Sequence, residues 1–133
     1  MEMQQDPVCR YLQLQGHALR PAWFQNTGYR LGWEFSTRFY SMTWRREGNI
    51  LLICDIQAVQ DTRGLESAVG ALIHLWRDII ISIKEVTEIR GMIANYGSPR
   101  QKQLRSKMKD ILLRQGAKTV TIKGEPWLVY TGK

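Results

Sequence analysis

A nearly unbroken apolar run, Ile50 to Ile56, restricts the secondary structure that the middle of this chain can adopt. Such a run is typical of a central β-strand that is covered on both sides. Further along, apolar side chains recur at intervals of three and four residues, at Leu65, Val69, Leu72, Ile73, Trp76 and Ile80. This spacing predicts an amphipathic helix from 65 to 81. Residues 79–84 would also suit a strand, so we place the end of the helix near Ser82 and leave their state open.

A second helix is predicted by its own start and stop signals. Ser98 can cap it, Pro99 suits the first helical position, and Gln101 completes a capping box. Gly116 stands where a left-handed terminating residue is expected. Leu104, Met108, Ile111, Leu112 and Gln115 form the inward-facing stripe. The helix is therefore predicted over 98–115.

The remaining elements are shorter. Asp6, Pro7 and Gly16 predict a first helix over 6–15. Residues 18–32 are predicted to be irregular, and two extended runs between 33 and 59 are separated by a hairpin loop at 45–49. Strands follow at 84–95, 119–123 and 127–131. Residues 1–133 are thus expected to form one α+β domain, a mixed or antiparallel sheet of about five strands packed by the helices at 65–81 and 98–115.

The net charge of +7 is unevenly distributed along the chain. Up to Gly97, ten Lys and Arg residues balance ten Asp and Glu residues; from Ser98 onward, nine basic residues face Asp110 and Glu125, which leaves the whole excess of seven. Like charges so close together repel unless something acidic approaches. The alternative interpretation is an ordinary solvated helix face.

The partner-binding candidates follow from this asymmetry. They are the cations of the second predicted helix, Arg100, Lys102, Arg105, Lys107, Lys109 and Arg114, together with Trp44. Trp44 stands next to Arg45 and Arg46, and we expect it to be the exposed member of the five tryptophans, because aromatic residues are enriched at interfaces. The expected partner is a protein with an acidic region.

Residues suited to catalysis are few. The two histidines, His17 and His74, have no nucleophile or carboxylate at a spacing that indicates a catalytic pair. Cys9 and Cys54 do not form a metal-binding or redox motif. Asp55 could act as an acid only if burial raised its pKa. We therefore expect no catalytic residue, no metal and no cofactor. The N-terminus lacks the apolar segment of a secretory signal, and no run approaches the ~20 residues of a membrane span, so a cytosolic protein is expected.

Two alternatives stay open. The loop Gly97-Ser98-Pro99 before a basic helix invites comparison with acyl-CoA-dependent N-acetyltransferases, in which a glycine-rich turn at a helix N-terminus holds pyrophosphate. Here Pro99 lacks an N–H and no second glycine follows. The basic helix could also bind nucleic acid, yet no helix-turn-helix spacing precedes it, and the aromatic residues do not match a base-stacking strand.

The residues from Leu104 to Ala117 form a basic, leucine-rich helix that ends in Gly-Ala, and the strand Trp127-Leu128-Val129 follows. This order resembles small accessory proteins of type III secretion systems, the low-calcium-response protein R (LcrR) family and the related SseE-like chaperones. A weaker likeness covers Phe39 to Leu75. The resemblance implies a non-enzymatic chaperone or regulator that binds a secreted translocator or effector, or a partner chaperone, before export, or that tunes expression of the secretion genes.

Overall fold

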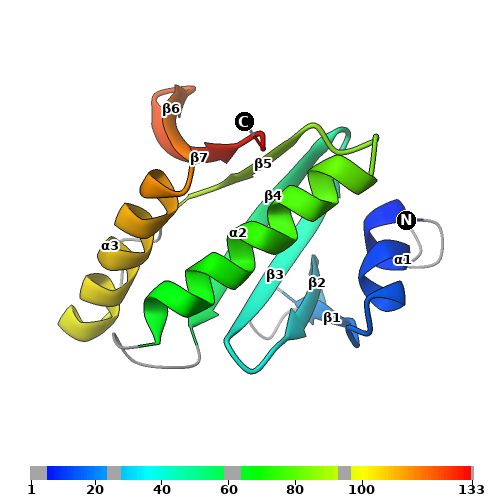
Figure 1. The fold of residues 1–133 in the computed structure, drawn as a ribbon, viewed down its shortest axis with the longest axis horizontal. Helices are drawn as coiled ribbons and strands as arrows, with labels where there is room; N and C mark the ends of the chain where they lie inside the picture. The colour runs from blue at the N-terminus through cyan, green and yellow to red at the C-terminus, as the bar shows by residue number, and fades with distance from the viewer. Residues whose placement is uncertain (1–5, 24–27, 59–63, 93–96, 133) are drawn as a thin grey trace.

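The computed structural model describes residues 6–23, 28–58, 64–92 and 97–132. Within these ranges the chain forms three helices and seven strands (Figure 1). In chain order they are α1 (Pro7–Leu14), β1 (Arg20–Trp23), β2 (Arg30–Ser36), β3 (Tyr40–Glu47), β4 (Ile50–Ala58), α2 (Leu65–Ser82), β5 (Glu88–Gly91), α3 (Pro99–Arg114), β6 (Lys118–Ile122) and β7 (Glu125–Tyr130). The predicted α+β class is confirmed.

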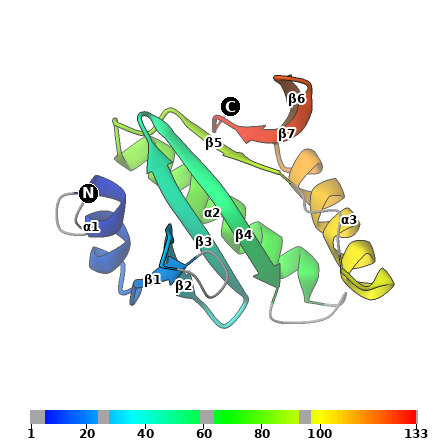
Figure 2. The ribbon, with the colours of Figure 1, turned by 180° about the vertical axis from the view of Figure 1, so that it is seen from behind.

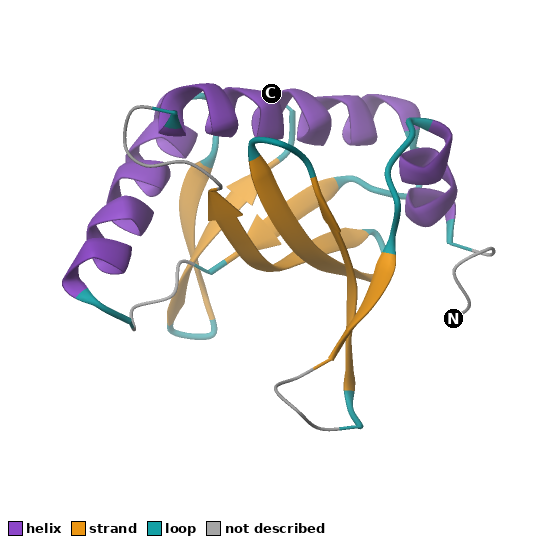
Figure 3. Ribbon diagram, turned by 90° about the horizontal axis from the view of Figure 1, so that it is seen from below, coloured by secondary structure: helices purple, strands orange, loops and turns teal. Residues whose placement is uncertain are grey.

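The seven strands form one mixed sheet in the order β1-β2-β3-β4-β5-β7-β6. β4 and β5 are parallel and are joined through α2, as parallel neighbours require a crossover, while the other described pairs are antiparallel. The three helices lie on one face of this sheet (Figure 3), and the view from behind shows the opposite face without a helix (Figure 2). The predicted count of about five strands was too low.

One additional strand, β1, lies within residues 18–32, which were predicted to be irregular, and β2 begins there at Arg30; residues 24–27 of this range lie outside the described residues. Pro21 is tolerated in β1 because β1 is an edge strand, where a missing N–H need not break a ladder. Gly32 does not mark a turn. A Cβ at Gly32 would lie 2.1 Å from the carbonyl oxygen of Trp44, so glycine is required there by the close approach of β2 and β3. The long run that begins at Trp33 is accordingly two strands, β2 and β3.

A β-bulge interrupts the alternation of side chains in β4. Thr43 pairs with Asp55 and Trp44 pairs with Ile53, so Cys54 has no counterpart on β3. The extra residue shifts the alternation, and Ile53 and Ile56 both pack toward the helices. Leu52 and Cys54 are only half-buried. The central position of the strand is confirmed, but the helices cover only one of its faces (Figure 3), and Ile50 and Leu52 line a groove with Ile122 and Trp127 instead.

The two main helices are confirmed close to their predicted bounds. In α2 the buried residues Leu65, Val69, Leu72, Ile73 and Trp76 follow the predicted stripe. The helix continues to Ser82, so the open segment 79–84 begins as helix. In α3 the capping box is present: the Gln101 N–H donates to Ser98 Oγ at 3.2 Å, and the Ser98 N–H donates to Gln101 Oε1 at 2.8 Å. β5 is only four residues long, and the predicted strand over 84–95 extends into 93–96, outside the described residues.

Candidate functional site

α3 carries its cations on two separate flanks. Its apolar side, Met108, Ile111 and Leu112, packs into the core. Lys102, Arg105 and Lys109 are spaced by three and four residues and therefore share one side of the helix. Arg100, Lys107 and Arg114 recur every seven residues and share another side. The predicted single cationic surface is therefore divided into two lines.

The line Arg100–Lys107–Arg114, which we call the α2 flank, is partly neutralised. Arg114 Nη1 lies 3.5 Å from Glu66 Oε1 at the start of α2, and both side chains are largely exposed. Lys107, Asp110 and Arg114 share a groove with Leu65 and Glu66. Three cations thus face two carboxylates on this side, which leaves a formal excess of one. An exposed pair of this kind contributes little to stability, about 0–1 kcal/mol, but it reduces the local field.

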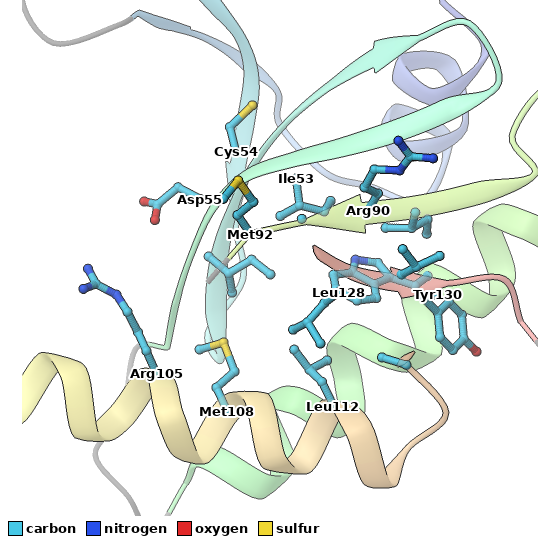
Figure 4. A pocket seen from close by; sticks show the side chains of 16 residues that line it. Ile53, Cys54, Asp55, Arg90, Met92, Arg105, Met108, Leu112, Leu128 and Tyr130 are labelled. Atoms are coloured by element: carbon cyan, nitrogen blue, oxygen red, sulfur yellow. The ribbon is translucent and has the colours of Figure 1, made fainter. Parts of the chain in front are cut away.

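The line Lys102–Arg105–Lys109, which we call the notch flank, keeps more of its charge. Lys102 and Lys109 form no ion pair with a carboxylate of the described residues. Lys102 is exposed and Lys109 is half-buried. Arg105 reaches from α3 toward the ends of β4 and β5 (Figure 4). This flank is therefore the more cationic side of the helix.

A cavity beside the notch flank lies where β4 and β5 part. The parallel pairing of the two strands ends at Ile53 and Gly91, although β4 continues to Ala58. The cavity has a volume of about 70 Å³ and lies between these strands, α3 and β7. Ile53, Met108, Leu112 and Leu128 supply apolar walls, and Asp55 and Arg105 lie at the same end (Figure 4). We call this cavity the β4–β5 notch.

Cys54 and Asp55 are titratable residues that line the notch. Burial raises the pKa of the Cys54 thiol, which keeps it protonated and a poor nucleophile. Asp55 is half-buried and accepts a hydrogen bond from Gln57 Nε2 at 3.0 Å. Neither histidine lines the notch.

Each histidine lies beside one neighbouring side chain. The ring of His17 packs against Phe35 with 4.6 Å between centroids, and burial lowers its pKa. His74 Nε2 lies 3.4 Å from Asp78 Oδ2 on the exposed side of α2. Across the described ranges, no three His, Cys, Asp or Glu side chains gather in a way that could hold a metal ion.

The starts of the two long helices are poorly suited to pyrophosphate. At α3 the amides of Ser98 and Gln101 already donate to each other's side chains through the capping box. At α2 no side chain caps the helix, but Glu66 places a negative charge in the first turn. An anion at the start of α3 would find these N–H donors already occupied, and an anion at the start of α2 would lie close to the carboxylate of Glu66. These observations disfavour the acyl-CoA alternative.

Trp44 corrects one of the candidate residues. Its side chain is fully buried, in the core cluster with Met42 and Ile53. The reason is its place in β3, near the middle of the sheet, on the side that faces the helices. The expectation that Trp44 is exposed was therefore wrong. The most exposed tryptophan of the described residues is Trp23, at 51%, on the edge strand β1.

The six basic candidates all lie on α3, but the notch is not evident from the sequence. The two flanks could have been read from the spacing of seven residues between Arg100, Lys107 and Arg114. Met92, Arg90 and Gly91 line the notch and gave no sequence signal, because the point where β4 and β5 separate depends on the bulge and on the short length of β5.

Comparison with known protein families matches residues 5–103 to the family described as type III secretion system regulator (LcrR). The chain belongs to the LcrR family. The LcrR match covers α1 to β5 and the beginning of α3, so the family predicted from the sequence is confirmed. A search among curated proteins finds no significant match.

The extent of the LcrR match differs from the basis of the predicted resemblance. Leu104 to Ala117, on which the likeness chiefly rested, lies beyond the matched residues, whereas the weaker likeness over Phe39 to Leu75 lies within them. Of the basic candidates, Arg100 and Lys102 fall inside the match. None of the helices in the described ranges is both long and apolar enough to cross a membrane.

Proposed function

We propose that this LcrR-family regulator acts without catalysis, by holding a partner protein in the cytosol before export. The partner is a secreted translocator or effector subunit, or a chaperone that accompanies one, and it carries an acidic region. The observation that supports this proposal is the excess of cations on α3: six Lys and Arg residues against Asp110, a formal excess of five on one helix.

Charge of this kind favours encounter with an acidic partner and selects against basic ones. Complementary potentials raise association rates and specificity more than they raise affinity. Most of the affinity must then come from apolar contact, which the β4–β5 notch beside α3 can supply. The two features lie side by side on one part of the molecule.

A protein partner fits this arrangement better than nucleic acid does. Nucleic acids are held chiefly through phosphates, which use positive charge but not an apolar cavity. The C-terminal half of α3 also packs beside the first half of α2 (Figure 1), with Met108, Ile111 and Leu112 turned into the core. The combination of a cationic flank with an apolar notch is one that an acidic protein segment with apolar side chains can satisfy in full.

Co-expression tests the proposal. The chain is produced together with the products of the neighbouring secretion genes, one at a time, and each mixture is analysed by size-exclusion chromatography. We expect a stable heterocomplex with one of them, which weakens as the salt concentration rises because charge steers the contact. If the protein elutes alone beside every neighbour, the partner-holding function is wrong.

Nucleic acid is the competing outcome. Fluorescence titration with DNA at several salt concentrations measures it. Sequence-selective affinity that falls steeply with salt, together with the lack of any protein complex, would replace the proposal with a DNA-binding regulator.

A further inference from the structure

β6 is the last strand of the sheet and is open along one side. In the part of the chain that the structure describes, β6 pairs with β7 alone and ends the strand order. Residues 118–121 are all exposed, Val120 at 40%. Alternate N–H and C=O groups of an edge strand point away from its neighbour, where they can pair with another chain. β6 is therefore a template for an added strand.

The open side of β6 lies within a part of the chain that is described without a gap. Residues 97–132 contain α3, β6 and β7, and β6 begins beside the C-terminal end of α3 (Figure 1). β7 separates β6 from β5, and β1 ends the sheet on the opposite side. The exposure of residues 118–121 thus marks a strand that no described element covers on its outer side.

The two edges of the sheet differ in how they resist pairing. β1 carries Pro21 and a register shift after Ala22, and proline and bulges are common devices against edge pairing. β6 has neither, because its register with β7 is regular from Lys118 to Ile122. Residues 119–122 are uncharged and β-branched, which favours a strand conformation. The middle of β6 is suited to accept a strand, whereas β1 is not.

Lysines at the two ends of β6 determine which chain it can accept. Lys118 begins the strand and Lys123 follows it; both are exposed, and neither forms an ion pair with another described residue. Antiparallel pairing with a second copy about Val120 would place Lys118 beside Lys123 of that copy, and like charges so close repel. The two-fold axis of such a pair is perpendicular to the sheet, so the two cationic α3 helices would lie on the same face. A segment with acidic residues at both ends meets opposite charges instead.

The apolar side of β6 selects the middle of that segment. Lys118, Val120 and Ile122 alternate along the strand and therefore share one face. Val120 lies opposite Trp127, and Ile122 and Trp127 line a groove of about 470 Å³ together with Ile50. An aliphatic side chain that lies beside Val120 would bury apolar surface and form a cross-strand pair.

From these features we infer that β6 is the docking site for an extended segment of the partner protein that carries an aliphatic residue between acidic ones. The segment adds a strand to the open side of β6, lays its aliphatic side chain beside Val120 and places its carboxylates near Lys118 and Lys123. This mode is β-strand addition, in which main-chain hydrogen bonds supply affinity and side-chain contacts supply specificity. The inference rests on the proposed function, since it locates a contact with the partner that this function requires.

The position of β6 is compatible with contact at the β4–β5 notch. Ala117, which directly precedes β6, lines the notch. Leu128 and Val129 of β7, the strand that pairs with β6, also line it. A partner at the notch is therefore one strand away from the open side of β6.

Hydrogen exchange on the heterocomplex tests the location. The exchange rates of the backbone amides in 118–122 are measured by mass spectrometry or NMR, with and without the partner recovered by co-expression. We expect at least about tenfold slower exchange there in the complex, because added strand hydrogen bonds protect amides. The opposite edge strand β1 is the internal control, and the amides of Arg20, Ala22 and Trp23 should exchange at the same rate in both states.

The two proposals can fail separately. If a complex forms but residues 118–122 stay unprotected, or if β1 is protected instead, the docking site is wrong while the partner-holding function stands. If no complex forms with any neighbour, the function itself is wrong and the docking site is withdrawn with it.

Two substitutions at one position test the charge of the segment together with its location. Val120→Glu and Val120→Lys remove the same aliphatic contact from an exposed site. Val120→Glu should weaken the complex at least about tenfold more than Val120→Lys, because only the glutamate repels the carboxylates of the segment. Leu14→Glu, at the end of α1 where Leu14 is 85% exposed, should leave affinity unchanged. Equal effects of the two changes at Val120, or an equal effect of Leu14→Glu, would overturn the inference.

A second copy of the chain is the rival occupant. Size-exclusion chromatography with light scattering should show that the isolated protein is a monomer, and hydrogen exchange should find the amides of 118–122 unprotected in it. A dimer in which these amides are protected would make β6 a self-association surface and would refute the docking of a partner segment there.

Discussion

Asp6 ties the first helix to the middle of the sheet. Its Oδ1 accepts a hydrogen bond from the Val8 N–H at 2.8 Å, which caps α1, and it lies 3.5 Å from Arg46 Nε on β3. Both side chains are largely buried. A single carboxylate thus caps a helix and neutralises a cation that would otherwise be costly to bury.

Removing this carboxylate should destabilise the fold. Asp6→Ala is expected to lower the free energy of unfolding by about 2–3 kcal/mol, because it loses the cap and leaves Arg46 without that charge. Asp6→Asn keeps the capping oxygen and should cost only about 1 kcal/mol. Urea denaturation measures both. Equal losses would show that the contact with Arg46 contributes nothing.

Two buried groups should make stability depend on alkaline pH. Burial raises the pKa of Cys9 from 9.0 to about 12 and that of Tyr40 from 10.0 to about 12. Below pH 9.0 both groups are protonated whether the chain is folded or unfolded, so their contribution to stability is fully present. As the pH rises toward 12, the unfolded chain loses these protons first, and stability falls by about 1.4 kcal/mol per pH unit for each group.

Because burial also raises the pKa of Cys54, the two groups are separated in a background that lacks this thiol. The free energy of unfolding of Cys9→Ala/Cys54→Ala should begin to fall about one pH unit later than that of Cys54→Ala, since only Tyr40 remains of the two groups. Urea denaturation at a series of pH values measures this onset. The same onset near pH 9 in both proteins would contradict the assignment to Cys9.

Among the elements, the helices were more predictable than the strands. The stripe of α2 and the capping box of α3 are local patterns, and local patterns survive in almost any fold. β1 was missed because Pro21 usually argues against a strand, and its edge position cannot be read from nearby residues. The bulge at Cys54 depends on how β3 and β4 pair, which the residues of β4 alone do not encode.

The same limit applies to the candidate site. The basic residues of α3 were identified from composition, but the notch beside them arises where three distant segments, β4, β5 and α3, meet. Trp44 was misplaced for the related reason that its burial depends on the helices that cover β3.

Two glycines test how closely the elements pack. Gly32→Ala would bring a methyl group against the carbonyl of Trp44 and should cost about 3 kcal/mol or more, because β2 and β3 must separate. Gly70→Ala lies inside α2, where an added Cβ meets no atom within 4 Å, and should stabilise by about 0.5–1 kcal/mol. Thermal unfolding compares the two. A neutral Gly32→Ala would show that the strands are not held this closely.

On the scale of the whole molecule, the excess positive charge of α3 and the β4–β5 notch lie in one region. The N-terminal part of the sheet, β1 to β3, and α1 complete the core, while the parallel pair β4–β5, α3 and β7 form the notch. The excess positive charge of the chain lies on the same side, along α3. The family match identifies a type III secretion regulator, and this region is where we place the contact through which it acts.

Charge reversal on the two flanks of α3 tests this placement most directly. The double variant Lys102→Glu/Lys109→Glu alters the notch flank, and Arg100→Glu/Lys107→Glu makes the same change of net charge on the α2 flank. The dissociation constant of the heterocomplex is measured for both. The notch-flank variant should bind at least about tenfold more weakly, and the α2-flank variant should stay within about threefold of the unchanged protein. Equal weakening by both variants, or none by the first, would contradict a partner held at the β4–β5 notch.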